Sequence, residues 1–295
     1  MRWLLLLLSL AAFSGCQPVD QKAIILSFKY QPGEVYTYSI FDDVESHRVV
    51  ERQGKEVYYV RQSQESTIQV LERDSAGVYT LKITFVVKTD SLWREEAGKK
   101  ILSQRERPRV GRKFEYTLRM REDGEIIDVK GRDESSTFFF ERAYKTSQPV
   151  FPREKIAPGY SWRQNVAISM PSAETFSALT EYTFSGFTTV DNSECAVIDF
   201  TSTLEIKTEL THTKWNRKKH QKWDYENLTT SKGKLYFDYK KGVMVKKEST
   251  ITMRRKSDII DKNGMEKKDF RHTVDKELIR LVCVHRDSVK THSPE

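Results

Sequence analysis

The most constraining feature of this sequence is a set of long segments in which apolar and polar residues alternate. Segment 79–88 places five apolar side chains on one face (Tyr79, Leu81, Ile83, Phe85 and Val87), and the other face carries the polar residues Thr80, Lys82, Thr84 and Lys88. Segment 196–210 repeats the pattern with Ile198, Phe200, Leu204, Ile206 and Leu210. A period of two is that of a half-buried β-strand. At about 3.3 Å per residue, such strands cross a whole domain, so the chain is expected to be mainly β.

Three elements occur twice in the same order, which predicts a duplicated β-rich unit. A Pro-Gly turn precedes an aromatic strand at Pro32-Gly33 and at Pro158-Gly159; a hairpin with a long second arm follows; then come two strands around Gly124 and around Gly242. The predicted units are 31–148 and 149–295. The alternative is that any long antiparallel sheet is self-similar. At this level the choice between one continuous sheet and two separate domains stays open.

A helix is predicted between the two units, within segment 132–152. Asp133 or Ser135 can cap its start, the run 138–140 with Ala143 and Tyr144 gives an apolar face at helical spacing, and Pro149 ends it. A helix with so many aromatic residues needs an apolar surface to pack against, and the concave side of a curved sheet would supply one. The expected fold is therefore two tandem units of long, curved antiparallel sheet, half-barrel-like, with one or two short helices.

The N-terminus has the composition of a targeting segment. Arg2 precedes an apolar run, 3–13, that is too short to span a bilayer core of about 30 Å as a helix. The residues that follow, Phe13-Ser14-Gly15-Cys16, resemble the lipobox of bacterial lipoproteins, in which the cysteine is acylated and becomes the mature N-terminus. We therefore expect a signal peptide at 1–15 and a lipidated linker at 16–30. The alternative is an ordinary signal peptide or an uncleaved anchor.

The lipobox resemblance implies a location. The protein would be lipid-anchored in the bacterial cell envelope, and Gln17 after the cysteine favours the outer membrane, facing the periplasm. Each buried methylene of an acyl chain contributes roughly 0.8 kcal/mol, so several chains hold a soluble domain at a membrane. The chain has 50 Lys and Arg against 42 Asp and Glu, a formal net charge of +8. In this compartment that excess favours anionic lipid over nucleic acid.

The layout as a whole also resembles known proteins. The lipobox, the PG-x-x-Y motif at 32–36 and the FD-x-x-x-G turn at 237–242 resemble a broad set of uncharacterised bacterial envelope lipoproteins with tandem β-rich repeats. The expected architecture is similar to that of lipoprotein-carrier-like half-barrels. This second resemblance implies a hydrophobic cavity that can hold acyl chains. Neither resemblance carries functional residues over to this sequence.

One segment combines basic and aromatic residues in the way that suits the headgroup zone of a membrane. Its candidate membrane or partner contacts are Lys214, Trp215, Arg217, Lys218, Lys219, Lys222 and Trp223. The alternative is a hairpin end whose tryptophans pack on the sheet. A lesser candidate surface is Arg254-Arg255-Lys256.

Motifs for catalysis or metal binding are not found. His212 and His220 lack the spacing of zinc ligands, the acidic pairs Asp42-Asp43 and Asp133-Glu134 suit turns or a helix start, and SKGK at Ser231 lacks the first half of a phosphate loop. No catalytic residue, metal or cofactor is predicted. Cys195 and Cys283 lie in apolar, strand-like contexts and are a candidate disulfide. The alternative is two free thiols.

Three functions follow from these features. The first is a non-enzymatic, membrane-anchored lipoprotein that binds a lipid or another hydrophobic ligand in the cell envelope. The second is a structural or interaction subunit that docks an envelope protein partner. The third and least favoured is an envelope hydrolase, whose active site would have to be assembled from scattered residues. The first two differ in whether side chains of the protein itself fill the concave face of the sheet.

Overall fold

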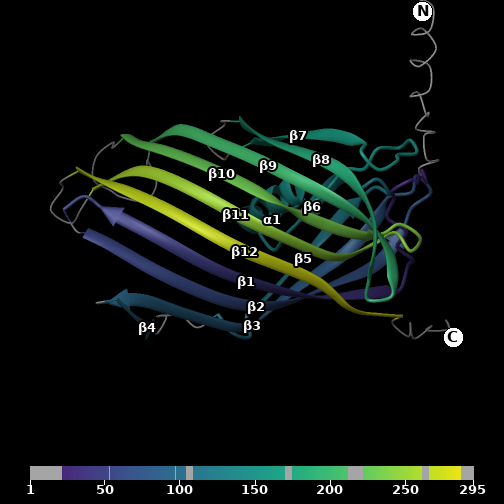
Figure 1. Ribbon diagram of the computed structural model, residues 1–295, viewed down its shortest axis with the longest axis horizontal. Coiled ribbons are helices and arrows are strands. Elements are labelled where there is room, and N and C mark those ends of the chain that lie inside the picture. The colour runs from purple at the N-terminus through teal and green to yellow at the C-terminus, as the bar shows by residue number, and fades with distance from the viewer. Residues whose placement is uncertain are drawn as a thin grey trace, which may run out of the picture.

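The computed structural model describes residues 22–52, 54–96, 98–103, 109–169, 175–211, 222–260 and 266–286, and it is built on one sheet (Figure 1). Its elements are β1 (Glu34–Val50), β2 (Gly54–Arg73), β3 (Tyr79–Glu96), β4 (Lys99–Ser103), β5 (Lys113–Met120), β6 (Ile126–Lys130), α1 (Glu134–Ser147), β7 (Ser161–Ser169), β8 (Thr175–Val190), β9 (Ser193–Thr211), β10 (Lys222–Asp238), β11 (Val243–Ile260) and β12 (Glu266–Arg286). The antiparallel sheet has the order β6-β5-β3-β2-β1-β12-β11-β10-β9-β8-β7, and β4 pairs with β3. The expected mainly β, curved fold is confirmed.

The two predicted units lie in one continuous sheet because the last strand pairs with the first. β12 runs antiparallel to β1 along its whole length, from Glu34 opposite Arg286 to Val50 opposite Asp269. Each predicted unit runs across the sheet in the same direction. In the first unit the strands follow one another in the order β1, β2, β3, β5 and β6, and in the second unit in the order β7, β8, β9, β10 and β11. The two units thus place their matched sequence elements in the same strand order. That one unit arose by duplication of the other stays a prediction.

The apolar faces of the alternating strands meet inside the curve of the sheet. Leu81 and Ile83 of β3 and Ile198 of β9 have at most 1% of their surface exposed and belong to one large core cluster. This cluster lies at the end of the sheet that carries both chain ends drawn in Figure 1. We call it the core end, and the opposite end, where Val50 and Ile206 lie, the far end. The strands extend well past the core toward the far end.

Residues 24–30 are part of the core, which corrects the expected linker at 16–30. Ile24, Leu26, Phe28 and Tyr30 alternate into the cluster, each with 7% or less of its surface exposed. Their backbone bonds tie three parts of the chain together. Ile24 and Ile156 exchange N–H···O bonds of 2.8 Å, Phe28 N donates to Glu122 O at 2.7 Å, and Lys29 N donates to Gly242 O at 3.1 Å. A side chain at Gly242 would collide with Lys29, so glycine permits this approach.

Helix α1 begins at the predicted cap and spans the gap between the edges of the sheet. The Asp133 side chain accepts from Ser136 N at 2.7 Å, and Ser136 Oγ accepts from Asp133 N at 2.9 Å, which forms a capping box. The helix contacts both edge strands, β6 and β7. Phe140 stacks on Tyr116 of β5 with ring centroids 4.0 Å apart. As predicted, the helix covers apolar side chains inside the curve. No helix of the described residues has the length and apolarity to cross a membrane.

Candidate ligand-binding face

Beyond the core, the concave face carries apolar side chains that are partly accessible. Val44, Val60 and Leu92 lie opposite one another on β1, β2 and β3, and Ile251 and Met253 lie on β11. All five are neither buried nor fully exposed. Val44 and Val60 follow the buried core positions of their strands in steps of two. Leu92 shares their face because it pairs with Val60 beyond the register shift at Ser63 and Gln64. Ile251 and Met253 do so because Asp275 and Thr273, which lie opposite them, also lie opposite Val44 and Ser46 of β1. A ligand with apolar groups could therefore contact this part of the face.

A second, smaller apolar cluster lies near one side of the same face. Ala178, Leu204 and Ile206 are buried, with Val166 and Phe176 packed against them. Leu204 lies opposite Thr229, which lies opposite Met253, so the cluster and the accessible side chains belong to neighbouring positions of one surface. The concave face at the far end is therefore apolar on one side and mixed toward β1.

Three carboxylates, which we call the acidic belt, cross the middle of the concave face. They are Asp42 on β1 and Asp275 and Glu277 on β12. Burial, with the nearby charges of Asp42, Glu277 and Asp43, raises the pKa of Asp275 to about 7. Burial and the charge of Glu277 raise the pKa of Asp42 to about 6. At neutral pH the belt therefore holds fewer charges than it has carboxyl groups.

Lys247 keeps the third carboxylate ionised. Its Nζ donates to Glu277 at 2.8 Å, and Ser249 Oγ donates to the same carboxylate at 2.9 Å. Burial opposes the ionisation of Glu277, but Lys247 and Ser249 outweigh it and lower the pKa. The Asp42-Asp43 pair was expected in a turn and instead lies within β1, where alternation sends Asp42 to the concave face and Asp43 to the outer one. Among the described residues, no three His, Cys, Asp or Glu side chains are placed to hold a metal ion.

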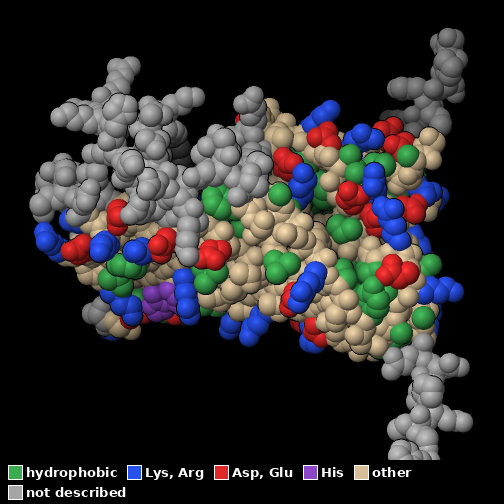
Figure 2. Space-filling model, turned by 90° about the horizontal axis from the view of Figure 1, so that it is seen from above, with side chains coloured by type: hydrophobic (Ala, Val, Ile, Leu, Met, Phe, Trp, Pro, Cys, Tyr) green, Lys and Arg blue, Asp and Glu red, His purple; other side chains and the backbone are tan. Residues whose placement is uncertain are grey.

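The outer face at the far end has two adjoining hollows, of about 460 and 510 Å³, that share His47 and His272. These histidines lie opposite each other on β1 and β12. Val49 and Phe270 line the first hollow and are exposed by 45% and 43%. Histidine side chains lie among basic ones toward the end of the molecule away from the termini (Figure 2). The outer face thus offers a shallow contact surface with apolar and basic groups.

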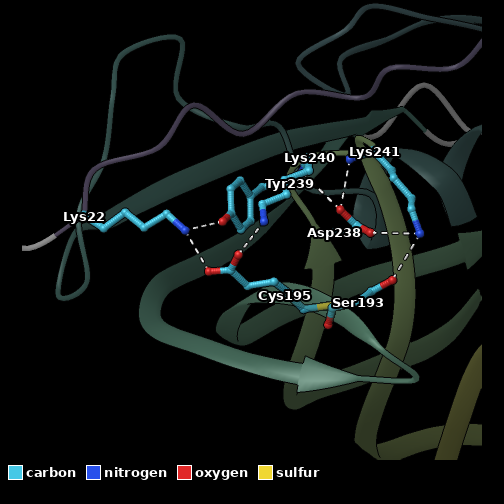
Figure 3. A network of polar contacts seen from close by, with 8 residues as sticks. Lys22, Ser193, Cys195, Asp238, Tyr239, Lys240 and Lys241 are labelled. Atoms are coloured by element: carbon cyan, nitrogen blue, oxygen red, sulfur yellow. Dashed lines mark hydrogen bonds and ion pairs between the residues drawn. The ribbon is translucent and has the colours of Figure 1, made fainter.

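At the core end, a polar network ties the start of the described chain to the sheet (Figure 3). Lys22 Nζ lies 2.7 Å from Glu194 and also donates to the Tyr239 hydroxyl, and Lys240 Nζ lies 2.7 Å from the same carboxylate. Hydrogen bonds from Lys22 and Lys240 lower the pKa of Glu194 to about 2. Asp238 accepts from the backbone N–H groups of Lys240 and Lys241 at 3.1 and 2.9 Å. The network fixes the chain shortly after the predicted lipidation site.

The candidate disulfide between Cys195 and Cys283 is not formed, and both residues are free thiols. Cys195 is on β9 and Cys283 on β12, with β10 and β11 between them in the sheet. Three strand spacings are about 14 Å, whereas a disulfide needs Cα atoms within about 7 Å. Burial, followed by the charge of Asp238, raises the pKa of the Cys195 thiol to about 11, and Cys283 is exposed.

Most of the other predicted contacts lie outside the described residues. These are Cys16 and, in the basic aromatic segment, Lys214, Trp215, Arg217, Lys218 and Lys219. Lys222 and Trp223 open strand β10, where they pair with Thr211 and Leu210 of β9. That segment therefore joins the far ends of β9 and β10. Of the lesser surface 254–256, Arg255 takes the concave face and its two neighbours the outer face.

Sequence reasoning missed the acidic belt. Its members come from positions 42, 275 and 277, and only the pairing of β1 with β12 brings them together. A signal was present in the sequence. Asp42, Asp275 and Glu277 stand at positions that should be apolar if their strands were covered on one face along their whole length. A charged residue at a position of this kind indicates that the concave face there is not part of the hydrophobic core.

The protein is a mainly β protein built on one curved, open antiparallel sheet. No protein-family model and no curated protein matches the sequence. Among solved structures it is similar to one of lipovitellin, with a TM-score of 0.49 and 9% sequence identity. That structure describes lipid–protein interactions in lipovitellin. The similarity covers 90% of this chain and 27% of that one, so this chain spans about a quarter of its length. A similarity of this degree does not extend to function.

Proposed function

We propose that the protein is a lipid-anchored bacterial envelope protein that binds a hydrophobic or amphiphilic ligand on its concave face without catalysing a reaction. The observation that carries the proposal is the set of partly accessible apolar side chains beyond the core, above all Val44, Val60 and Met253. Apolar surface that water can reach inside a concave sheet gains free energy when an apolar ligand covers it. The anchor rests on the lipobox resemblance at Cys16.

The ligand proposed here is amphiphilic rather than purely apolar. The accessible side chains are interleaved with polar ones: Thr273 lies opposite Met253, and Asp275 lies opposite both Val44 and Ile251. Burying those polar groups under a hydrocarbon alone would cost free energy because they would lose contact with water. A molecule with both polar and apolar parts matches this pattern better.

Native mass spectrometry of the mature domain, with Cys16→Ser to remove the anchor, tests the proposal. The protein is produced in the envelope compartment, and we expect an added mass that organic solvent extracts and that is identified as a lipid. The variant Met253→Glu places a charge on the concave face and should lose most of that mass. Thr252→Glu, whose side chain points to the outer face of the same strand, is the matched control and should keep it.

A clean apo mass from folded protein would contradict ligand binding. It would favour the alternative, docking of an envelope protein, for which the specific observation is the outer hollows with exposed Phe270 and Val49. Contiguous apolar groups at a surface mark interaction sites. Equal loss of lipid in the Met253 and Thr252 variants would also count against the concave face as the binding surface.

A further inference from the structure

Asp275 of the acidic belt lies among the partly accessible apolar side chains of the concave face. It is directly opposite Val44 on β1 and Ile251 on β11. Neighbouring strands are about 4.8 Å apart, so the backbones at Val44 and Ile251 are about 10 Å apart with Asp275 between them. A ligand that covers both apolar side chains therefore also covers the Asp275 carboxyl group.

The protein offers Asp275 little hydrogen bonding. Its Oδ1 is buried and meets no hydrogen-bond partner in the described part of the chain. The next residue on the same face of β12 is Thr273, and its hydroxyl shares a hydrogen bond of 3.0 Å with Ser46 of β1. A charged carboxylate at this position therefore depends on water at the accessible part of its side chain.

The charges that act on Asp275 are mostly of its own sign. Asp42 and Asp43 of β1 and Glu277 of β12 all disfavour its ionisation. Lys247 of β11 opposes them, but its Nζ donates to Glu277 at 2.8 Å. Farther away on the same face lie Asp90 of β3, Gln62 of β2, Ser231 of β10 and Arg271 of β12. An ionised Asp275 is therefore unfavourable even before a ligand binds.

A ligand on the concave face makes the charged form still less favourable. Burial and the neighbouring carboxylates already raise the pKa of Asp275 to about 7, so about half of the free protein carries the proton at neutral pH. A covering ligand removes water from the carboxylate, which raises the pKa further. The neutral carboxyl group loses less on covering, and its O–H can donate to a polar group of the ligand.

We propose that binding of the amphiphilic ligand is coupled to the uptake of a proton by the Asp275 carboxylate, so that the concave face holds its ligand more tightly at acidic than at alkaline pH. The inference rests on the proposed function and adds its regulation. The proton comes from the solvent and forms an O–H bond on the carboxylate, and no bond to the ligand is made or broken. Affinity is highest below the pKa of the free protein and falls as the pH rises through the higher pKa of the complex.

Calorimetric titration of the Cys16→Ser protein with a short-chain, soluble phosphatidylcholine tests the inference between about pH 5 and about pH 8. The net charge of this zwitterionic lipid does not change in that range, so a pH dependence comes from the protein. We expect the affinity to rise as the pH falls. A pKa that is about one unit higher in the complex corresponds to about a tenfold difference in affinity between the protonated and the ionised protein.

The binding heat supplies a second measurement that does not depend on affinity. At about pH 7 it should vary with the ionisation enthalpy of the buffer, with a slope that corresponds to an uptake of up to about half a proton. Asp275→Asn should remove this uptake. The variant should also bind the lipid at about pH 8 as tightly as the parent does at about pH 5.

Two further variants separate Asp275 from other groups. Glu248→Gln is the matched control, because Glu248 lies on β11 but points to the outer face, opposite Leu278, and its pKa is lowered. It should keep the pH dependence of the parent. Asp42→Asn removes a negative charge that acts on Asp275 and should move the fall in affinity to lower pH. If Asp275→Asn does not fold, this displacement decides the inference.

The outcomes distinguish this inference from the proposed function. Binding that is independent of pH, or weaker toward about pH 5, would overturn the proton coupling and leave ligand binding in place. A pH dependence that persists in Asp275→Asn would also overturn it, because another group, such as His47 or His272 on the outer face, would then take up the proton. Absence of lipid binding at every pH would contradict the proposed function itself.

Discussion

At the residue scale, the concave face of the sheet is chemically divided although its backbone is regular. The acidic belt crosses its middle, and Arg48, Arg271 and Arg255 lie nearer the far end. Asp275 is the residue most affected by its surroundings, because burial and three neighbouring carboxylates act on it together and raise its pKa to about 7. Lys247 counteracts them but bonds to Glu277 instead. A charged carboxylate at this position therefore destabilises the fold at neutral pH.

Asp275→Asn should stabilise the protein at about pH 8, and the gain should disappear toward about pH 4. The pKa of Asp275 is raised in the folded state from an ordinary value of 3.8, so the unfolded chain releases its proton first and stability falls as pH rises from about 4 to 7. Because the side chain is partly exposed, we expect a gain on the order of 1–2 kcal/mol. Urea unfolding at several pH values measures it. A gain that does not vary with pH would contradict this account.

At the element scale, α1 is the one described helix, and it sits where two sheet edges would otherwise be open. Its start is fixed by the capping box of Asp133 and Ser136. Its aromatic face packs Phe140 on Tyr116, and Tyr144 meets the same ring at 5.5 Å. An exposed edge strand invites pairing with another chain, so a helix between β6 and β7 protects the sheet as well as completing the core.

Asp133→Ala should lower the free energy of unfolding by about 1 kcal/mol, since the Ser136 N–H loses its acceptor. Chemical denaturation followed by tryptophan fluorescence measures the change. Asp133→Asn is the matched control because asparagine caps as well as aspartate, and it should behave like the parent. If the two variants are equally destabilised, the charge rather than the cap is responsible.

At the scale of the whole molecule, the described residues next to the two predicted membrane contacts, Lys22 on one side and Thr211 and Lys222 on the other, lie at opposite ends of the sheet. Residues 16–21 can span about 20 Å at most, and Lys22 is then held by Glu194 at the start of β9. The basic aromatic segment follows the other end of β9. Nineteen residues of strand are about 60 Å long. An anchor at Cys16 therefore places the core end at the membrane and the far ends of β9 and β10, at Thr211 and Lys222, away from it, unless the sheet lies flat on the bilayer.

In the full-length protein in membranes, a photo-crosslinking amino acid at Lys241 should capture lipid, and one at Lys256 should not. Lys241 is exposed beside the polar network at the core end, and Lys256 is exposed on the outer face at the far end. Mass spectrometry of the products identifies lipid adducts. Cys16→Ser should abolish the adducts at Lys241 and release the protein from the membrane fraction. Equal capture at both positions would mean that the sheet lies flat.

The sequence by itself determined the local structure. Alternation with a period of two placed the long strands and their buried faces, as at Leu81, Ile83 and Ile198, and the cap at Asp133 placed the helix. These signals succeed because strand alternation and helix capping depend on neighbours within a few residues. The turn glycines 124 and 242, both with positive φ, were found for the same reason.

Only the tertiary structure decided which strands are neighbours. The pairing of β1 with β12 joins positions more than 200 residues apart, and it creates the acidic belt. The same register separates Cys195 from Cys283 and draws residues 24–30 into the core. Alternation gives the face of a residue but not its partner on the next strand. The pairing follows from the packing of all strands together, so the concave face and its charges could not be predicted from the sequence alone.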